Sequence, residues 1–122
     1  MDVGQATAAG LYQQAAAGTF RIEEGAARRC AECFFRFTDS LEEMITDSNN
    51  LERSSGFGGF VSSQQLAQGF EGKGRELTEA LTGLKEAAFR MAAAYLQAGG
   101  LIEEAEQMNQ RAIMAATAGK AQ

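Results

Sequence analysis

Residues 54–60 read SSGFGGF and separate two long stretches of helical periodicity. Three glycines in four positions free the backbone for a sharp reversal. Ser62 and Gln65 follow at once and fit the S-x-x-Q capping box that begins a helix. We therefore predict a Gly-rich turn over 54–61. The residues expected at its tip are Gly56, Phe57, Gly58, Gly59 and Phe60.

A regular apolar repeat precedes this turn. Its members are Ala27, Cys30, Phe34, Phe37, Leu41, Met44, Ser48 and Leu51. Spacings that alternate between three and four place such side chains on one face of a helix, as in a coiled coil. Ala31 and Ile45 widen the stripe by one position. The pattern predicts a first long helix over 20–53.

The same spacing continues after the turn. Its main members are Leu66, Phe70, Leu77, Leu84, Met91, Ala98, Leu101, Ala105, Met108 and Ala112. Gly99 and Gly100 interrupt the composition, but the apolar phase runs on through them, so we predict one long helix over 62–116 with a kink at most. Residues 1–18 are rich in Ala and Gln and predict a short helix or arm, and residues 117–122 predict a flexible tail.

The composition agrees with a purely helical domain. The chain has 122 residues, enough for one domain over 1–122, and it contains no proline. Proline breaks the interior of helices, so its absence indicates long uninterrupted elements. The fold class predicted is all-α: an antiparallel hairpin of two long helices with a short N-terminal helix or arm.

Several classes of function are disfavoured by what the sequence lacks. It contains no histidine, which removes Ser-His-Asp and Cys-His catalysis and histidine-ligated metals. The net charge of −5 repels phosphate and argues against nucleic acid as a partner. No stretch is long and apolar enough to span a membrane, and the first residues do not resemble a secretory signal peptide. We expect no enzymatic activity and no cofactor.

One motif still offers chemistry, the C-x-x-C of Cys30 and Cys33. A redox-active pair needs the start of a helix beside a sheet, whereas this pair lies inside a predicted helix. A zinc site needs about four ligands, and the chain has only two cysteines. Structural thiols are the favoured interpretation, and a thiol redox or metal module is the alternative.

The width of the apolar stripes predicts assembly. A hairpin of two helices cannot cover both flanks of so broad a stripe, so we predict that a second hairpin docks and completes a four-helix bundle, as a homodimer or a heterodimer. The alternative is a monomeric three-helix bundle in which the N-terminal segment folds back. The residues expected in the interface or core are Phe34, Phe37, Leu41, Met44, Phe70, Leu77, Leu84 and Met91.

These features together are similar to one known family. Two helices joined by an aromatic–glycine turn resemble the small WXG-type helical-hairpin proteins of actinobacterial type VII secretion, over about residues 20–115. Phe57-Gly58-Gly59 stands as F-x-G where that family has W-x-G, and the chain has no tryptophan. The family's export signal, Y-x-x-x-D/E, finds Tyr95 followed by Gly99 instead of an acid.

The resemblance implies a secreted substrate of a type VII system, or a chaperone-like partner of a larger secreted protein. It implies binding to itself or to another WXG-like hairpin, and a cytoplasmic location before export to the medium or the cell envelope without a signal peptide. The alternative is a cytoplasmic helical adaptor or structural bundle unrelated to secretion.

Overall fold

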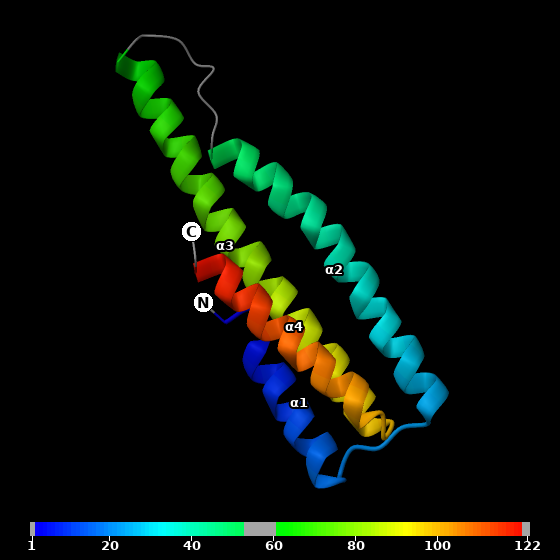
Figure 1. The fold of residues 1–122 in the computed structure, drawn as a ribbon. Helices are drawn as coiled ribbons and strands as arrows, with labels where there is room; N and C mark the ends of the chain where they lie inside the picture. The colour runs from blue at the N-terminus through cyan, green and yellow to red at the C-terminus, as the bar shows by residue number, and fades with distance from the viewer. Residues whose placement is uncertain (1, 53–60, 121–122) are drawn as a thin grey trace.

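The computed structural model describes residues 2–52 and 61–120, with the side chains of 2–50 and 73–118. Its elements are four α-helices: α1 (Gln5–Ala17), α2 (Glu24–Glu52), α3 (Val61–Ala98) and α4 (Ile102–Lys120) (Figure 1). Every regular element in the described ranges is helical, which confirms the all-α prediction. The predicted turn residues, Gly56 to Phe60, lie outside the described residues.

The long helix α3 is the centre of the arrangement. Each of the other three helices packs along it. Figure 1 shows α2 and α4 running antiparallel to α3, while α1 runs parallel to it. The N-terminal segment, predicted as a short helix or arm over 1–18, is therefore a docked helix.

The structure differs from the single helix predicted over 62–116. Helix α3 ends at Ala98, and α4 folds back along it from Ile102, instead of continuing beyond it. The apolar repeat through Ala105, Met108 and Ala112 is real, and all three residues are buried, but they face α3 of the same chain. Helix α4 also extends to Lys120, into the segment predicted as a flexible tail from residue 117.

Glycines in the left-handed conformation cause both reversals of direction in the described chain. Gly18 has φ 84° after α1, and Gly100 has φ 80° after α3. At the second site the Leu101 N–H donates to the Leu96 carbonyl over 2.9 Å, and the Gly100 N–H donates to the Gln97 carbonyl over 3.0 Å. This is a Schellman motif, in which glycine adopts the positive φ without a steric penalty.

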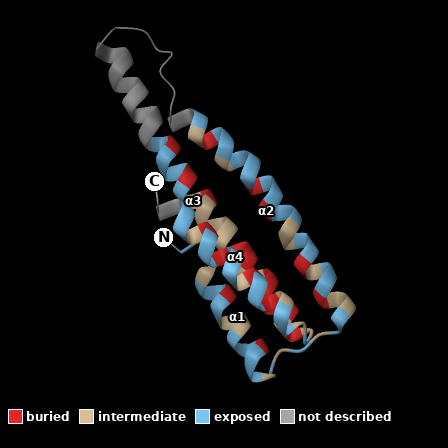
Figure 2. Cartoon of the chain, in the orientation of Figure 1, coloured by how far each residue is buried: buried red, intermediate tan, exposed pale blue. Residues whose placement is uncertain are grey.

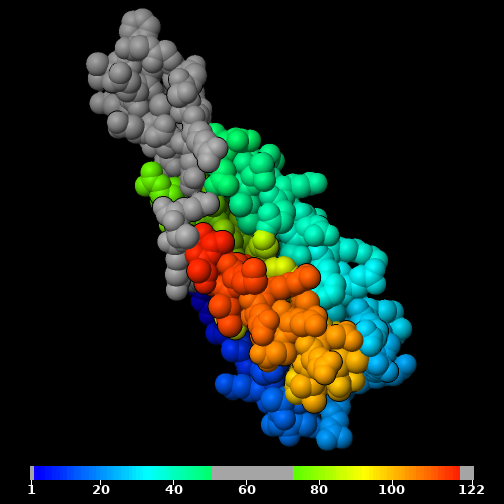
Figure 3. All heavy atoms as spheres, viewed as in Figure 1, coloured from blue at the N-terminus to red at the C-terminus, as the bar shows by residue number. Residues whose placement is uncertain are grey.

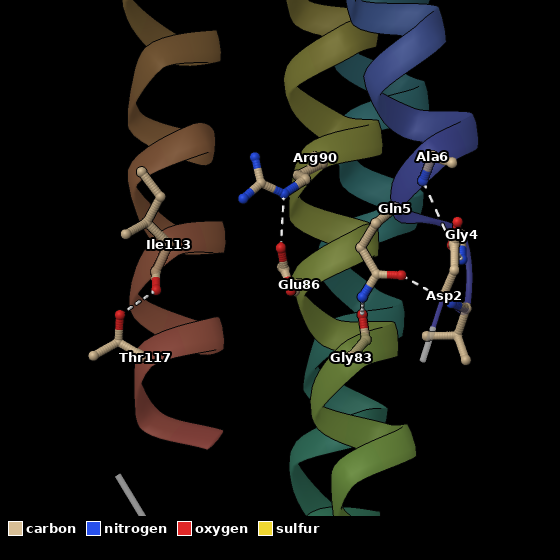
Figure 4. Close-up of polar contacts among 10 residues, drawn as sticks. Asp2, Gly4, Gln5, Ala6, Gly83, Glu86, Arg90, Ile113 and Thr117 are labelled. Atoms are coloured by element: carbon tan, nitrogen blue, oxygen red, sulfur yellow. Dashed lines mark hydrogen bonds and ion pairs between the residues drawn. The ribbon is translucent and has the colours of Figure 1, made fainter. Parts of the chain in front are cut away.

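A close approach of backbones fixes α1 against α3. The Gln5 side chain donates to the Gly83 carbonyl over 3.1 Å (Figure 4). A Cβ on Gly83 would lie 3.1 Å from the Val3 side chain, so only glycine fits there without a shift. Outside the helix, the Asp2 carboxylate accepts the Gly4 N–H over 2.8 Å, and that hydrogen bond lowers the pKa of Asp2.

The core is concentrated where α1 and α4 flank α3. Ala92, Ala93 and Ala94 are 0% exposed. Their side chains are small, so the other three helices can pack closely against α3. Figure 2 shows buried residues gathered on α3 and α4 there, whereas α2 is mostly exposed. We call this region, α3 from residue 83 with α1, α4 and the first half of α2, the four-helix end. The described remainder of α2 and α3 is the two-helix end.

Candidate functional site

The contact between α2 and α3 runs along a seam that differs in part from the predicted one. The α2 residues that are buried or half-buried on it are Ala27, Ala31, Phe34, Thr38, Leu41, Ile45 and Ser48. Their spacing alternates between four and three, so they lie on one face of the helix. The predicted repeat shares Ala27, Phe34, Leu41 and Ser48 with this seam.

The remaining predicted α2 residues lie beside the seam. Phe37 is 42% exposed and Met44 51% exposed, and Cys30 is half-buried. Each lies one position before a residue that packs in the seam, namely Ala31, Thr38 or Ile45. The seam includes the polar residue Thr38 at its centre. A search for repeating apolar residues passes over a threonine, so it does not find this seam.

The predicted α3 residues divide in a similar way. Leu77 is 46% exposed, whereas Leu84 and Met91 are half-buried. Seven residues separate each from the next, so they share one line along α3. Phe70 belongs to the same line in sequence, but its side chain lies outside the described part of the structure. Of the predicted residues whose side chains the structure describes, only Leu41 is fully buried, at 1% exposed.

A buried pair of hydroxyl groups crosses the seam at the two-helix end. The Ser48 and Thr78 oxygens are 2.5 Å apart, and each also lies 2.8 Å from a carbonyl of its own helix, Ile45 for Ser48 and Gly74 for Thr78. Each hydroxyl has one hydrogen, so one donates to the other while the second donates to its own carbonyl. The pair is fully satisfied and fixes the register of α2 on α3.

Ion pairs identify which flank of α2 faces α4. Arg28 of α2 lies 2.9 Å from Glu104 of α4, and Glu104 raises the pKa of Arg28. Glu42 of α2 pairs with Lys85 of α3. Arg28 and Glu42 are fourteen residues apart, about four helical turns, and so lie on the same flank. Such exposed pairs contribute little stability, but they orient the helix.

An aromatic cluster closes the four-helix end. The Tyr95 ring contacts Phe20 edge-on at 5.6 Å and stacks on Phe34 at 5.8 Å between centroids. Four residues later, a Cβ on Gly99 would overlap the side chain of Ala27. Gly99 is therefore the point where the start of α2 lies directly against the end of α3.

The C-x-x-C motif lies on the second and third turns of α2. Both thiols are free; Cys30 is half-buried and Cys33 is exposed. Within the described ranges, no three side chains of the His, Cys, Asp and Glu types come close enough to hold a metal ion. Of the two cysteines, the apolar repeat predicts only Cys30 on the buried face of α2.

A surface hollow lies between α3 and the end of α4. It has a volume of about 290 Å³, and its lining includes Lys85, Phe89, Arg111 and Met114. Two cations and apolar side chains without a carboxylate or a nucleophile among the lining residues are not a catalytic arrangement. The surfaces of α2 and α3 beside the seam are the stronger candidate site.

No family model, curated protein or solved structure was found to match this chain. Among the described helices, none combines the length and apolar character needed to cross a bilayer.

Proposed function

We propose that this protein is a non-enzymatic helix-pairing module of a type VII secretion pathway, either as a secreted substrate or as a chaperone-like partner of a larger secreted protein. It acts by docking the α2/α3 pair against another helical hairpin, over the exposed apolar side chains beside the seam. The link to secretion comes from the WXG-type resemblance of the sequence, and the pairing role comes from the surface of α2 and α3.

The observation that carries the pairing role is the exposure of large apolar side chains beside the seam. Phe37, Met44 and Leu77 are each exposed by more than two-fifths. Helix α1 reaches α3 only as far as Gly83, where Gln5 is bound, so Leu77 lies beyond it. Clustered exposed apolar groups on a helical protein are typical of a surface that another protein covers.

The experiment for the secretion role compares culture media. The protein, followed with a specific antibody, should accumulate in the medium of a wild-type strain and not of a strain that lacks the secretion ATPase. A cytoplasmic marker protein serves as the lysis control. Equal amounts in both media, or in neither, would contradict a role in the pathway.

A cytoplasmic helical adaptor is the second candidate. The observation that favours it is that α1 and α4 already cover α3 at the four-helix end, which makes much of the bundle self-contained. The adaptor predicts partner binding with no difference between the two media. The third candidate, a thiol module, predicts that Cys30→Ser/Cys33→Ser abolishes function, whereas the helix-pairing role predicts unchanged fold and binding.

A further inference from the structure

A second stripe with the spacing of a coiled coil runs along α2 outside the seam. It consists of Ala26, Cys30, Cys33, Phe37, Ser40 and Met44, spaced alternately four and three residues apart. None of the six is Asp, Glu, Lys or Arg, and the last four are exposed. The other exposed positions between Glu24 and Met44 are all charged. We call this set the α2 stripe.

The α2 stripe lies on the flank of α2 that faces away from α4. Phe37 follows Arg28 by nine residues, which is about 2.5 turns and therefore the opposite side of the helix. Arg28 is the residue that reaches Glu104 of α4. Helix α1 packs on α3 and not on α2. Within the described chain, no helix covers the α2 stripe.

We infer that the α2 stripe is the seam for a second copy of this chain, paired antiparallel, α2 against α2; the inference rests on the proposed helix-pairing role and names its surface and partner. The charges beside the stripe carry the choice of partner. On its solvent side the flanking positions at heptad spacing are Arg29, Arg36 and Glu43, basic toward the start of α2 and acidic toward its end. Such a gradient is complementary to itself when two copies run in opposite directions.

The register follows from the same spacing. With Phe37 opposite Ser40 of the second copy, Cys33 lies opposite Met44, and Arg36 lies opposite Glu43. The symmetry repeats each of these pairs. Arg36 currently contacts Glu32 of its own helix over 2.7 Å, and both side chains are mostly exposed, so Arg36 remains accessible to a second acid. Parallel pairing would give Arg36 no acid from the second copy at this flank.

Sedimentation of the full chain at tens of micromolar tests the pairing. The wild type should sediment as a dimer, and Phe37→Asp should weaken dimerisation at least tenfold. The matched control is Thr46→Asp, which adds the same charge at an exposed α2 position off the stripe. Helix content by circular dichroism should stay unchanged in both variants. A monomeric wild type, or a Phe37→Asp dimer as tight as the control, would overturn the inference.

Charge reversal tests the direction of pairing. Arg36→Glu should weaken the dimer about fivefold, because it faces Glu43 twice, and the added Glu43→Arg should restore the affinity. A double variant that is no tighter than Arg36→Glu alone contradicts the antiparallel register.

Thiol crosslinking gives an independent reading of the register. Cys33 of the two copies lie eleven residues apart along the helices, about 16 Å, too far for a disulfide. Oxidation should therefore link the Cys30→Ser/Met44→Cys variant between chains but not the Cys30→Ser control. Efficient linking of the control would show parallel pairing and refute the register.

These outcomes remain separable from the proposed function. A monomeric wild type that still reaches the medium through the secretion system overturns self-pairing alone. A dimer that never depends on that system for export contradicts only the secretion role.

Discussion

The two ends of the molecule use different residues to pack helices against α3. At the four-helix end α3 is surrounded, and its core is built from alanines that are 0% exposed. At the two-helix end α3 has α2 along one side, and the seam there uses Leu41, Leu81 and the hydroxyl pair of Ser48 and Thr78. Figure 3 shows the described end of α2 (green) reaching past the described end of α4 (red). Crowding around α3 requires small side chains, whereas the two-helix end has room to bury larger ones such as Leu41 and Leu81.

The largest expected effect comes from a charge at the four-helix end. Ala93→Asp places an unpaired carboxylate where the native side chain is 0% exposed, which should cost about 4 kcal/mol or more and leave little folded protein. The exposed Met44→Asp at the two-helix end is the comparison and should change the free energy of unfolding of the monomer only slightly. Urea unfolding followed by circular dichroism measures both. Similar losses in the two variants would contradict the contrast between the ends.

Within the two-helix end, a substitution in the seam should reduce the stability of the monomer more than one in the α2 stripe. Leu41→Ala removes a side chain that is 1% exposed and should cost about 3 kcal/mol. Met44→Ala, three residues along, removes one that is 51% exposed and should cost under about 0.5 kcal/mol at concentrations where the chain is monomeric. Equal costs in urea unfolding would mean that both residues are buried in the folded monomer.

The turn between α3 and α4 should tolerate no side chain at Gly99. Gly99→Ala forces a Cβ against Ala27, which should cost about 2 kcal/mol by overpacking. Gly10→Ala is the matched control, because a Cβ at that helical glycine meets nothing within 4 Å. The melting temperature should fall for the first variant and stay or rise for the second. An unchanged melting temperature for Gly99→Ala would mean that α2 does not lie against the end of α3.

The hydroxyl pair should show strong coupling. Ser48→Ala or Thr78→Val alone leaves one buried hydroxyl with a single partner and should cost about 1 kcal/mol. The double substitution should cost less than the sum of the two, because no hydroxyl is left without its partner across the seam. A double-mutant cycle in urea measures the coupling free energy. Additive losses would show that the two hydroxyls do not interact across the seam.

The smallest effect concerns the start of α1. Hydrogen bonding to the Gly4 N–H lowers the pKa of Asp2 from its ordinary value of 3.8. The folded state therefore favours the ionised carboxyl, so the stabilisation is present above pH 3.8 and disappears as the pH falls through the lowered value. Asp2→Asn should melt slightly below the wild type at pH 7, and the difference should vanish at the acid end. A difference in melting temperature that persists at acid pH would mean that the effect does not come from the charge of the Asp2 carboxylate.

Much of the architecture could be predicted from periodicity. The all-α class, the start of α3 and the apolar positions of α4 follow from spacing and capping, which are local properties. The reversal at Gly100 does not follow from spacing. A glycine pair inside an unbroken apolar phase is compatible with a kink and with a full reversal, and only the positive φ of Gly100 separates the two.

The seam shows a similar limit. Phe37 and Met44 are the larger apolar residues, so the pattern assigned them to the core, yet Thr38 and Ile45 occupy it. Hydrophobicity ranks what can be buried, but the direction in which α2 meets α3 depends on close approaches such as that of Ala27 and Gly99. These involve residues far apart in the chain, which a spacing rule does not compare.

The sequence by itself determined that the chain forms amphipathic helices, because helix propensity, capping and the spacing of apolar residues act within a few turns. The tertiary structure decided which apolar faces are buried. Helices α1 and α4 fold onto α3 and cover its Ala-rich faces. Helix α2 buries its seam residues against α3 and leaves the α2 stripe exposed. The physical reason is that burial is a competition among surfaces, and its outcome depends on which backbones can come close enough to exclude water.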